Sequence, residues 1–171
     1  MTQEQANQLD YIYNHINNFD LNDSVRKYNV LENFPNESYW TLRYDTYENR
    51  ISAIYGLSND ILYLNVGNNG VWGGGPGDIT TNEFIDITGF SYINLSLSAY
   101  FYDSNSSQWV KIYLVSENGS EIEVGSLPNG CTHKFIKFDI NQLSGNYKIK
   151  IKANRNSNWW VIAYIHDIYF S

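Results

Sequence analysis

Cysteine and histidine are scarce in this chain of 171 residues, which has one cysteine and three histidines. The single Cys131 excludes an intramolecular disulfide, and no cysteines and histidines have the spacing of a zinc site. Cys131 and His133 are too close in sequence to indicate a catalytic pair, so Cys131 is interpreted as an ordinary thiol. The length suits one domain, and we expect its hydrophobic core to hold the fold.

Long apolar runs are also missing. No segment approaches the roughly 20 apolar residues that a membrane-spanning helix requires. The N-terminus has no cationic stretch leading into an apolar one, so no signal peptide is recognisable. Unless a leader has been removed, we expect the protein not to use the ordinary secretory route.

Positive charge is limited to 11 lysines and arginines against 18 acidic residues, which gives a net charge of -7 and a pI of about 4.8. Such a chain repels phosphate backbones, so we exclude nucleic acid as its main partner. Aromatic residues make up 16% of the chain, with 15 tyrosines, and charged residues only 17%. Much of the surface must therefore be Asn, Ser, Thr and Tyr, which favours hydrogen bonding over ionic contacts.

One helix is predicted, over residues 2–19. Thr2 and Gln5 form a capping-box pair, and Leu9, Ile12, Ile16 and Phe19 place an apolar stripe along one face. The stripe either docks on the chain's own sheet or serves as a docking or oligomerisation helix in an assembly. We expect this helix at residues 1–20, a connection at 21–38 and a β-sandwich at 39–171.

The remainder is typical of strands separated by turns rich in Asn, Asp, Ser and Gly. About ten short strands at this spacing predict an all-β, antiparallel sandwich or barrel. The expected strands are Tyr39–Tyr44, Ile51–Tyr55, Ile61–Val66, Glu83–Ile87, Tyr92–Tyr102, Trp109–Val115, Glu121–Val124, Lys134–Ile140, Tyr147–Ala153 and Trp159–Phe170.

Alternation along these strands predicts which faces meet water. Lys148, Lys150 and Lys152 point to one side of their strand, which we interpret as a solvated, charged face that discourages aggregation. Other strands combine polar and aromatic side chains on one face. These are Tyr92, Asn94, Ser96, Ser98, Tyr100 and Tyr102 on one strand, and Trp109, Lys111 and Tyr113 on another.

Two segments that we expect to be loops carry tryptophan among polar residues. Asn68–Asp78 holds Trp72 in a glycine-rich stretch, and Asn154–Trp160 contains Arg155, Asn158, Trp159 and Trp160. The glycine-rich stretch lacks the Gly-Lys-Ser/Thr ending of a P-loop, so its glycines are interpreted as turn residues. Alternation sends Trp159 and Trp160 to opposite faces, so one is expected in the core and the other at the surface. Trp40 is expected in the core or against the helix.

Three segments resemble the galactose-binding-like jelly roll of carbohydrate-binding modules. They are Phe84–Tyr100, with its Asp-Ile-Thr-Gly turn into a long strand, Tyr147–Asn154, which is similar to the penultimate strand, and Tyr164–Phe170, which is similar to the closing strand. The resemblance spans roughly residues 60–171 and implies a jelly-roll β-sandwich. It also places Asp167 where many members hold a structural calcium. Calcium takes six to eight oxygen ligands, so a surface aspartate is the competing interpretation.

No motif indicates catalysis. The chain lacks Gly-x-Ser-x-Gly and His-Glu-x-x-His, so we expect no enzyme activity and no cofactor other than that calcium. A hydrolase built from distant carboxylates among Asp78, Glu83, Asp86 and Asp103 stays open as an alternative.

We therefore predict a non-catalytic module that binds host cell-wall polysaccharide in a phage tail or baseplate. The alternative is a structural virion protein that assembles through its jelly roll, and the alternative location is secreted or on a cell surface. Sugar binding needs aromatic faces that stack on pyranose C–H groups beside polar side chains that bond hydroxyls. The expected ligand-binding residues are Trp72, Asp78, Tyr100, Tyr102, Trp109, Arg155, Asn158, Trp159 and Trp160.

Overall fold

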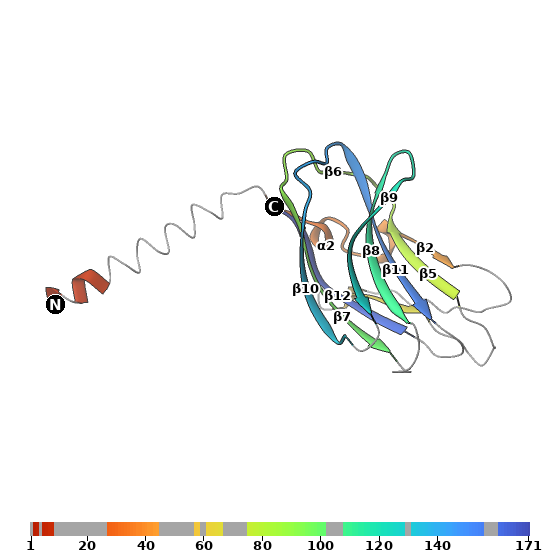
Figure 1. Ribbon diagram of the computed structural model, residues 1–171, viewed down its shortest axis with the longest axis horizontal. Helices are drawn as coiled ribbons and strands as arrows, with labels where there is room; N and C mark the ends of the chain where they lie inside the picture. Colours follow the sequence, from red (N-terminus) through yellow and green to blue (C-terminus); the bar gives the residue numbers. More distant parts are fainter. Residues whose placement is uncertain are drawn as a thin grey trace.

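The computed structural model of the chain describes residues 2–3, 5–8, 27–44, 57–58, 61–66, 75–101, 108–128, 131–155 and 161–171. These residues form an antiparallel β-sandwich with few helices, as predicted, and Figure 1 shows its two layers side by side. Within the described ranges, no helix has the length and apolar character needed to cross a membrane.

Sheet A has the strand order β10-β7-β12-β4-β3, and β1 also pairs with β12. Its strands are β1 (Tyr28–Asn29), β3 (Leu57–Ser58), β4 (Ile61–Val66), β7 (Tyr92–Phe101), β10 (His133–Asp139) and β12 (Val161–Phe170). Sheet B has the order β2-β5-β11-β8-β9, and β6 also pairs with β11. Its strands are β2 (Trp40–Tyr44), β5 (Gly75–Thr81), β6 (Ile85–Asp86), β8 (Trp109–Ser116), β9 (Glu121–Pro128) and β11 (Asn146–Arg155).

The inner faces of both sheets form one core. Alternate residues of β7, β8 and β11 point inward, as the sequence pattern predicted, because each sheet has one face covered by the other. β12 also buries one side, with a register shift between Ile165 and Asp167. Trp40 is 3% exposed and its indole N–H donates to the Phe34 carbonyl at 3.3 Å, so the prediction of a core tryptophan is confirmed.

The segment before β2 also contributes to this core. It contains β1, the short helix α2 (Val30–Asn33) and a 3-10 turn, η1 (Glu37–Tyr39). Val30, Leu31 and Phe34 are buried, and Asn29 caps α2 by accepting from the N–H groups of Leu31 and Glu32 at 3.0 and 3.2 Å. Part of the stretch that the sequence analysis placed in a connection therefore packs inside the sandwich.

The capping box at the start of the chain is confirmed. The Gln5 N–H donates to Thr2 Oγ1 at 3.2 Å, and the Thr2 N–H donates to Gln5 Oε1 at 2.9 Å, while residues 3 and 5–8 are helical. The apolar stripe from Leu9 to Phe19 lies outside the described residues, so the role of this helix stays a prediction.

The prediction of a glycine-rich loop through residue 78 was wrong for its second half, because β5 begins at Gly75. This strand pairs with β2 on one side and β11 on the other, with Leu42 opposite Ile79 and Ile151 also opposite Ile79. Pairing on both sides outweighs the poor strand propensity of glycine and proline, and Pro76 lies near the strand start, where a missing N–H is tolerated. The expected strand at 51–55 lies outside the described residues.

The Asp-Ile-Thr-Gly turn holds the end of the sandwich together. The Thr88 N–H donates to Asp86 Oδ1 at 3.0 Å, and Gly89 has a φ of 85°, a left-handed value that favours glycine. Thr88 Oγ1 in turn accepts from the N–H of Gly145, whose φ is 93°, at 2.9 Å. This motif therefore connects the turn before β7 to the turn before β11.

Replacing the α2 cap should show that residues 28–34 are part of the folded domain. Asn29→Ala should lower the free energy of unfolding by about 1–2 kcal/mol, because two N–H groups lose their acceptor. Asn29→Ser keeps a side-chain oxygen at the cap and should cost less. Urea denaturation measures both, and equal losses would show that the cap is not the cause.

Candidate functional site

The outer face of sheet B, called here the lysine face, gathers charged and aromatic side chains from five strands. Cross-strand register aligns Thr41, Thr80, Lys150, Tyr113 and Glu123 in one row. The lysine face also includes the outward side chains of Arg43, Asp78, Trp109, Lys111, Glu121, Lys148 and Lys152. The residues that alternate with these along the same strands point into the core, so a packed sheet holds the lysine face in place.

A hollow of about 300 Å³ opens on this face. Its lining comes from β2, β5, β8, β9 and β11, and also includes the side chain of Phe84, just before β6. Lys148 and Lys150 form part of the lining, and the Lys148 ammonium lies 4.8 Å from the centre of the Phe84 ring. Phe84 is 43% exposed, so its ring is available to a ligand in the hollow.

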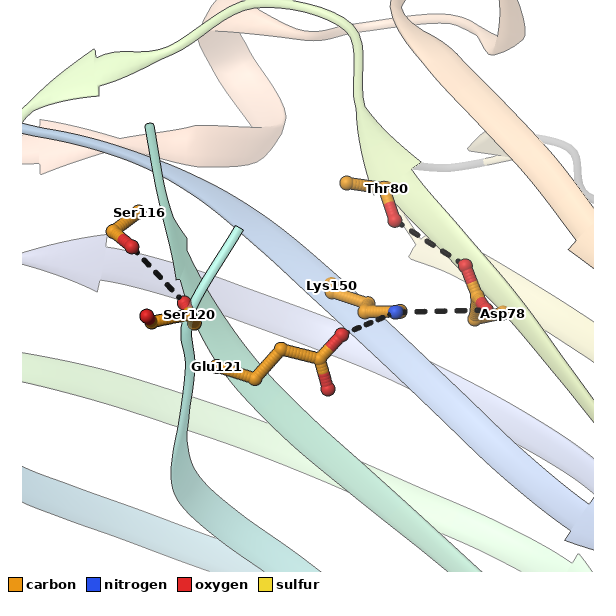
Figure 2. Close-up of polar contacts among 6 residues, drawn as sticks. All are labelled: Asp78, Thr80, Ser116, Ser120, Glu121 and Lys150. Carbon is orange, nitrogen blue, oxygen red and sulfur yellow. Dashed lines mark hydrogen bonds and ion pairs between the residues drawn. The ribbon is translucent and has the colours of Figure 1, made fainter. Parts of the chain in front are cut away.

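Lys150, which lines this hollow, lies between two carboxylates. Its ammonium lies 2.5 Å from Glu121 Oε1 and 3.9 Å from Asp78 Oδ2, and Thr80 Oγ1 donates to the other Asp78 oxygen at 3.3 Å (Figure 2). The side chains of Lys150 and Asp78 are only 15% and 13% exposed. The prediction of a solvated lysine face is therefore wrong at Lys150, which is held in a half-buried ion cluster by partners on β5 and β9.

Burial dominates the electrostatics of Asp78. It raises the pKa of the Asp78 carboxyl above its ordinary value, although Lys150 and the Thr80 hydrogen bond act in the opposite direction. Burial likewise raises the pKa of the Tyr113 phenol. Charged groups that are partly removed from water interact more strongly with a polar ligand than exposed ones do.

The turn between β8 and β9 forms one rim of the hollow. Ser116 Oγ donates to Asn118 Oδ1 at 2.6 Å and lies 3.2 Å from the Ser120 carbonyl oxygen, as Figure 2 shows for the second contact. Gly119 in this turn has a φ of 85°. These bonds fix the position of Glu121, the residue that follows the turn.

One row of the lysine face carries an excess of positive charge. Arg43, Asp78, Lys152 and Lys111 lie opposite one another on four adjacent strands. Lys111 is paired with Glu123 at 2.9 Å, and its ammonium lies 5.2 Å from the centre of the Trp109 ring. Like charges directly opposite on neighbouring strands are unfavourable, so the Lys111 and Lys152 pair favours an anionic group between them.

The predicted site residues divide between the two sheets. Asp78 and Trp109 lie on the lysine face, where Asp78 is a strand residue and not part of a loop. Tyr100 and Asp167 belong to the outer face of sheet A, and Tyr100 is 55% exposed. Arg155 is the last residue of β11 and lies opposite Gly75 of β5. The predictions for Trp72, Tyr102, Asn158, Trp159 and Trp160 fall outside the described residues.

Sequence reasoning missed Lys150, Glu121 and Phe84 as site residues. The alternating lysines of β11 were interpreted as a solvated face. The strands that carry Trp109 (β8) and Glu121 (β9) also alternate, and they turn these side chains to the same side of sheet B. Only the register shows that these side chains share one hollow.

In the part of the chain that the structure describes, no three His, Cys, Asp or Glu side chains are grouped to hold a metal ion. Asp167 Oδ1 accepts from the Asn29 side-chain amide at 3.3 Å, so calcium at Asp167 stays a prediction without a ligand set in these ranges. The Asp86 carboxylate accepts from the Thr88 N–H in the turn before β7, and Asp103 lies outside the described residues.

Comparison with known proteins yields fold relatives only. No family model and no curated protein matches the chain. A family 61 carbohydrate-binding module solved in complex with β-1,4-galactotriose aligns over 85% of this chain and 98% of its own, with 12% identity and a TM-score of 0.52. The chain has the β-sandwich fold of carbohydrate-binding modules.

Two other solved structures are less similar. A variant of a family 29 carbohydrate-binding module aligns over 77% of this chain and 91% of its own, with 12% identity and a TM-score of 0.42. The enzymatically active domain of tailspike protein 4 from bacteriophage CBA120 aligns over 81% of this chain and 20% of its own, with 22% identity and a TM-score of 0.49.

Removing Lys150 should show how much this lysine stabilises the domain by pairing with the Asp78 carboxylate. Lys150→Met should destabilise the domain at pH 7 by about 1–3 kcal/mol, because Asp78 keeps its charge without its partner. The folded-state pKa of Asp78 is already raised, so this loss should shrink as the pH falls and Asp78 takes up a proton. Denaturation at several pH values measures the effect.

A double variant provides the control. Asp78→Asn combined with Lys150→Met should recover part of the stability lost in Lys150→Met alone. A loss that is unchanged both by low pH and by Asp78→Asn would contradict the ion-cluster explanation.

Proposed function

We propose that this protein is a non-catalytic glycan-binding module and that the lysine face is its binding surface. The observation that carries the proposal is the hollow on one sheet face, which combines half-buried polar groups with an exposed aromatic ring. Pre-organised polar groups bond sugar hydroxyls at little entropic cost, while aromatic rings stack on the apolar face of a pyranose. The fold shared with a carbohydrate-binding module supports the same assignment.

The charge of the lysine face favours a glycan that carries carboxylate or phosphate groups. Arg43, Lys148 and Lys152 have no carboxylate within ion-pair distance among the described residues. These cations occur in a chain of net charge -7, so their position on one face is a local departure from the general charge. Positive groups gathered at a hollow attract an anionic ligand and bind it more weakly as salt concentration rises.

We further propose that the module serves host adhesion in a phage tail or baseplate and recognises host cell-wall polysaccharide there. The capped helix ahead of the sandwich supports attachment to a larger assembly through residues 1–20. Weak single-site binding would be raised by several copies on one particle.

Aromatic variants on the lysine face should lose binding and keep the fold. Phe84→Ala and Trp109→Ala should each weaken retention by host-wall polysaccharide about tenfold, because stacking contacts are lost, and affinity electrophoresis with a polysaccharide panel measures this. With an acidic polysaccharide as the ligand, Phe135→Ala removes an exposed aromatic ring from sheet A, on the other face of the sandwich, and is the matched control. Thermal unfolding verifies that every variant is folded.

Other outcomes would favour the alternatives. Binding to no polysaccharide, together with tight association of residues 1–20 with a tail protein, would favour a structural virion component. Release of reducing sugar from wall polysaccharide would identify a hydrolase, for which Asp78 and Glu83 remain candidate carboxylates.

The preference for acidic glycans has its own test. Lys152→Gln should weaken binding to an acidic polysaccharide several-fold and reduce the dependence of binding on salt, while binding to a neutral polysaccharide changes little. Lys134→Gln, on the edge strand β10 of sheet A, is the control because this exposed ammonium donates to the Ser126 carbonyl oxygen and contacts no side chain of the lysine face. Equal effects on both polysaccharides would contradict an electrostatic role for Lys152.

A further inference from the structure

The outer face of sheet A contains a second feature, called here the aromatic trough. Its floor is the outer side of β7, with the small polar residues Asn94, Ser96 and Ser98. Strands β10 and β12 pair with β7 on either side and supply larger side chains as walls. The walls are His133, Phe135 and Lys137 on β10, and Tyr164, Asp167 and Tyr169 on β12. A hollow of about 330 Å³ lies between Phe135 and Asp167 and extends toward the end of the trough formed by Asn94, Lys137 and Tyr169.

The walls present exposed but fixed rings. Phe135 is 77% exposed and Tyr164 37% exposed. The His133 ring packs edge-on against Phe135 with ring centres 4.7 Å apart, so the most exposed ring has a lateral support. On the opposite wall, the Lys27 ammonium lies 4.1 Å from the centre of the Tyr169 ring. Supported aromatic rings lose little conformational entropy when a ligand covers them.

The floor offers hydrogen-bonding groups. Ser98 Oγ lies 2.7 Å from His166 Nε2, and burial lowers the pKa of His166, with nearby His133 acting in the same direction. The lowered pKa of His166 favours the neutral imidazole at pH 7. The Ser96 hydroxyl has no hydrogen-bond partner in the part of the chain that the structure describes, and Asp167 uses one carboxylate oxygen for Asn29. Donors and acceptors thus alternate along the floor with little net charge.

The dimensions of the trough restrict its occupant. The two walls stand on strands separated by β7, roughly 10 Å apart, whereas a helix with its side chains is about 10–12 Å wide. An extended peptide cannot add to β7 as a new strand, because both edges of β7 are already paired. Serine is also depleted at protein–protein interfaces. A narrow, hydroxyl-rich chain fits these features better than a protein does.

We propose that the aromatic trough is a second saccharide-binding site, specific for neutral oligosaccharide chains. Sugar rings stack on Phe135 and Tyr164, and their hydroxyls bond Ser96, Ser98 and Asp167. The site rests on different residues from the lysine face and does not depend on the function proposed for that face. A protein with both sites would hold an acidic and a neutral glycan segment on opposite surfaces.

Titration of the labelled full chain with neutral oligosaccharides, followed by amide NMR, tests this proposal. The probes are mannohexaose, β-1,4-galactotriose and cellohexaose. At least one should shift the amide signals of Ser96, Ser98 and Phe135, and Phe135→Ala should weaken that binding about tenfold or more, which corresponds to about 1.4 kcal/mol. Phe84→Ala, an exposed phenylalanine at the lysine face, should leave the trough affinity unchanged.

Two results would overturn the trough assignment. One is the absence of shifts at these amides with all three probes. The other is a dimer in sedimentation experiments that dissociates in Phe135→Ala, which would show that the face binds a second copy of the chain. The two sites are tested with different substitutions. If the trough binds no sugar, the experiments on the lysine face still test the function proposed there. A thermal unfolding transition of Phe135→Ala like that of the unchanged chain excludes misfolding as the cause of the lost binding.

Discussion

The outer surface of each sheet depends on the pairing of its central strand, which is β11 in sheet B and β12 in sheet A. Strand β12 pairs with β7 along one edge and with β4 and β1 along the other. Its inward side chains are at most 1% exposed. They are Val161, Ala163, Ile165, Ile168 and Phe170. A shift of one residue would turn this apolar set to solvent, so the core fixes the register and the register fixes which side chains become neighbours outside.

The two outer faces use this frame differently. On the lysine face, three charged groups from three strands are held together and partly removed from water, with Lys150 between Asp78 and Glu121. In the aromatic trough, a floor of small polar residues lies between aromatic walls. Because the core is complete without either set, outward residues are free to carry ligand chemistry, and fold alone does not decide that chemistry.

Alternation made much of the fold predictable. The predicted strand at 61–66 matches β4, and the faces expected for Tyr92–Tyr102 are those observed in β7. The method failed where tertiary contacts override local preference. Residues 75–78 are poor strand formers but pair on two sides, and Val30 and Phe34 follow no strand or helix periodicity long enough to recognise. Of the candidate site, Trp109 was found as an aromatic residue on an alternating strand face, whereas Asp78 was found only as the end of an expected loop.

The sequence by itself determined the fold class, the inward and outward sides of the strands that alternate clearly, β4, β7, β8 and β11, and the capping box of the first helix, because these depend on spacings of two to four residues. Tertiary structure alone decided which outward residues meet. Lys150 and Glu121 lie 29 positions apart, and Phe135 faces Ser96 across β10 and β7. Such contacts arise from long-range strand order and register, which no local pattern of residues encodes.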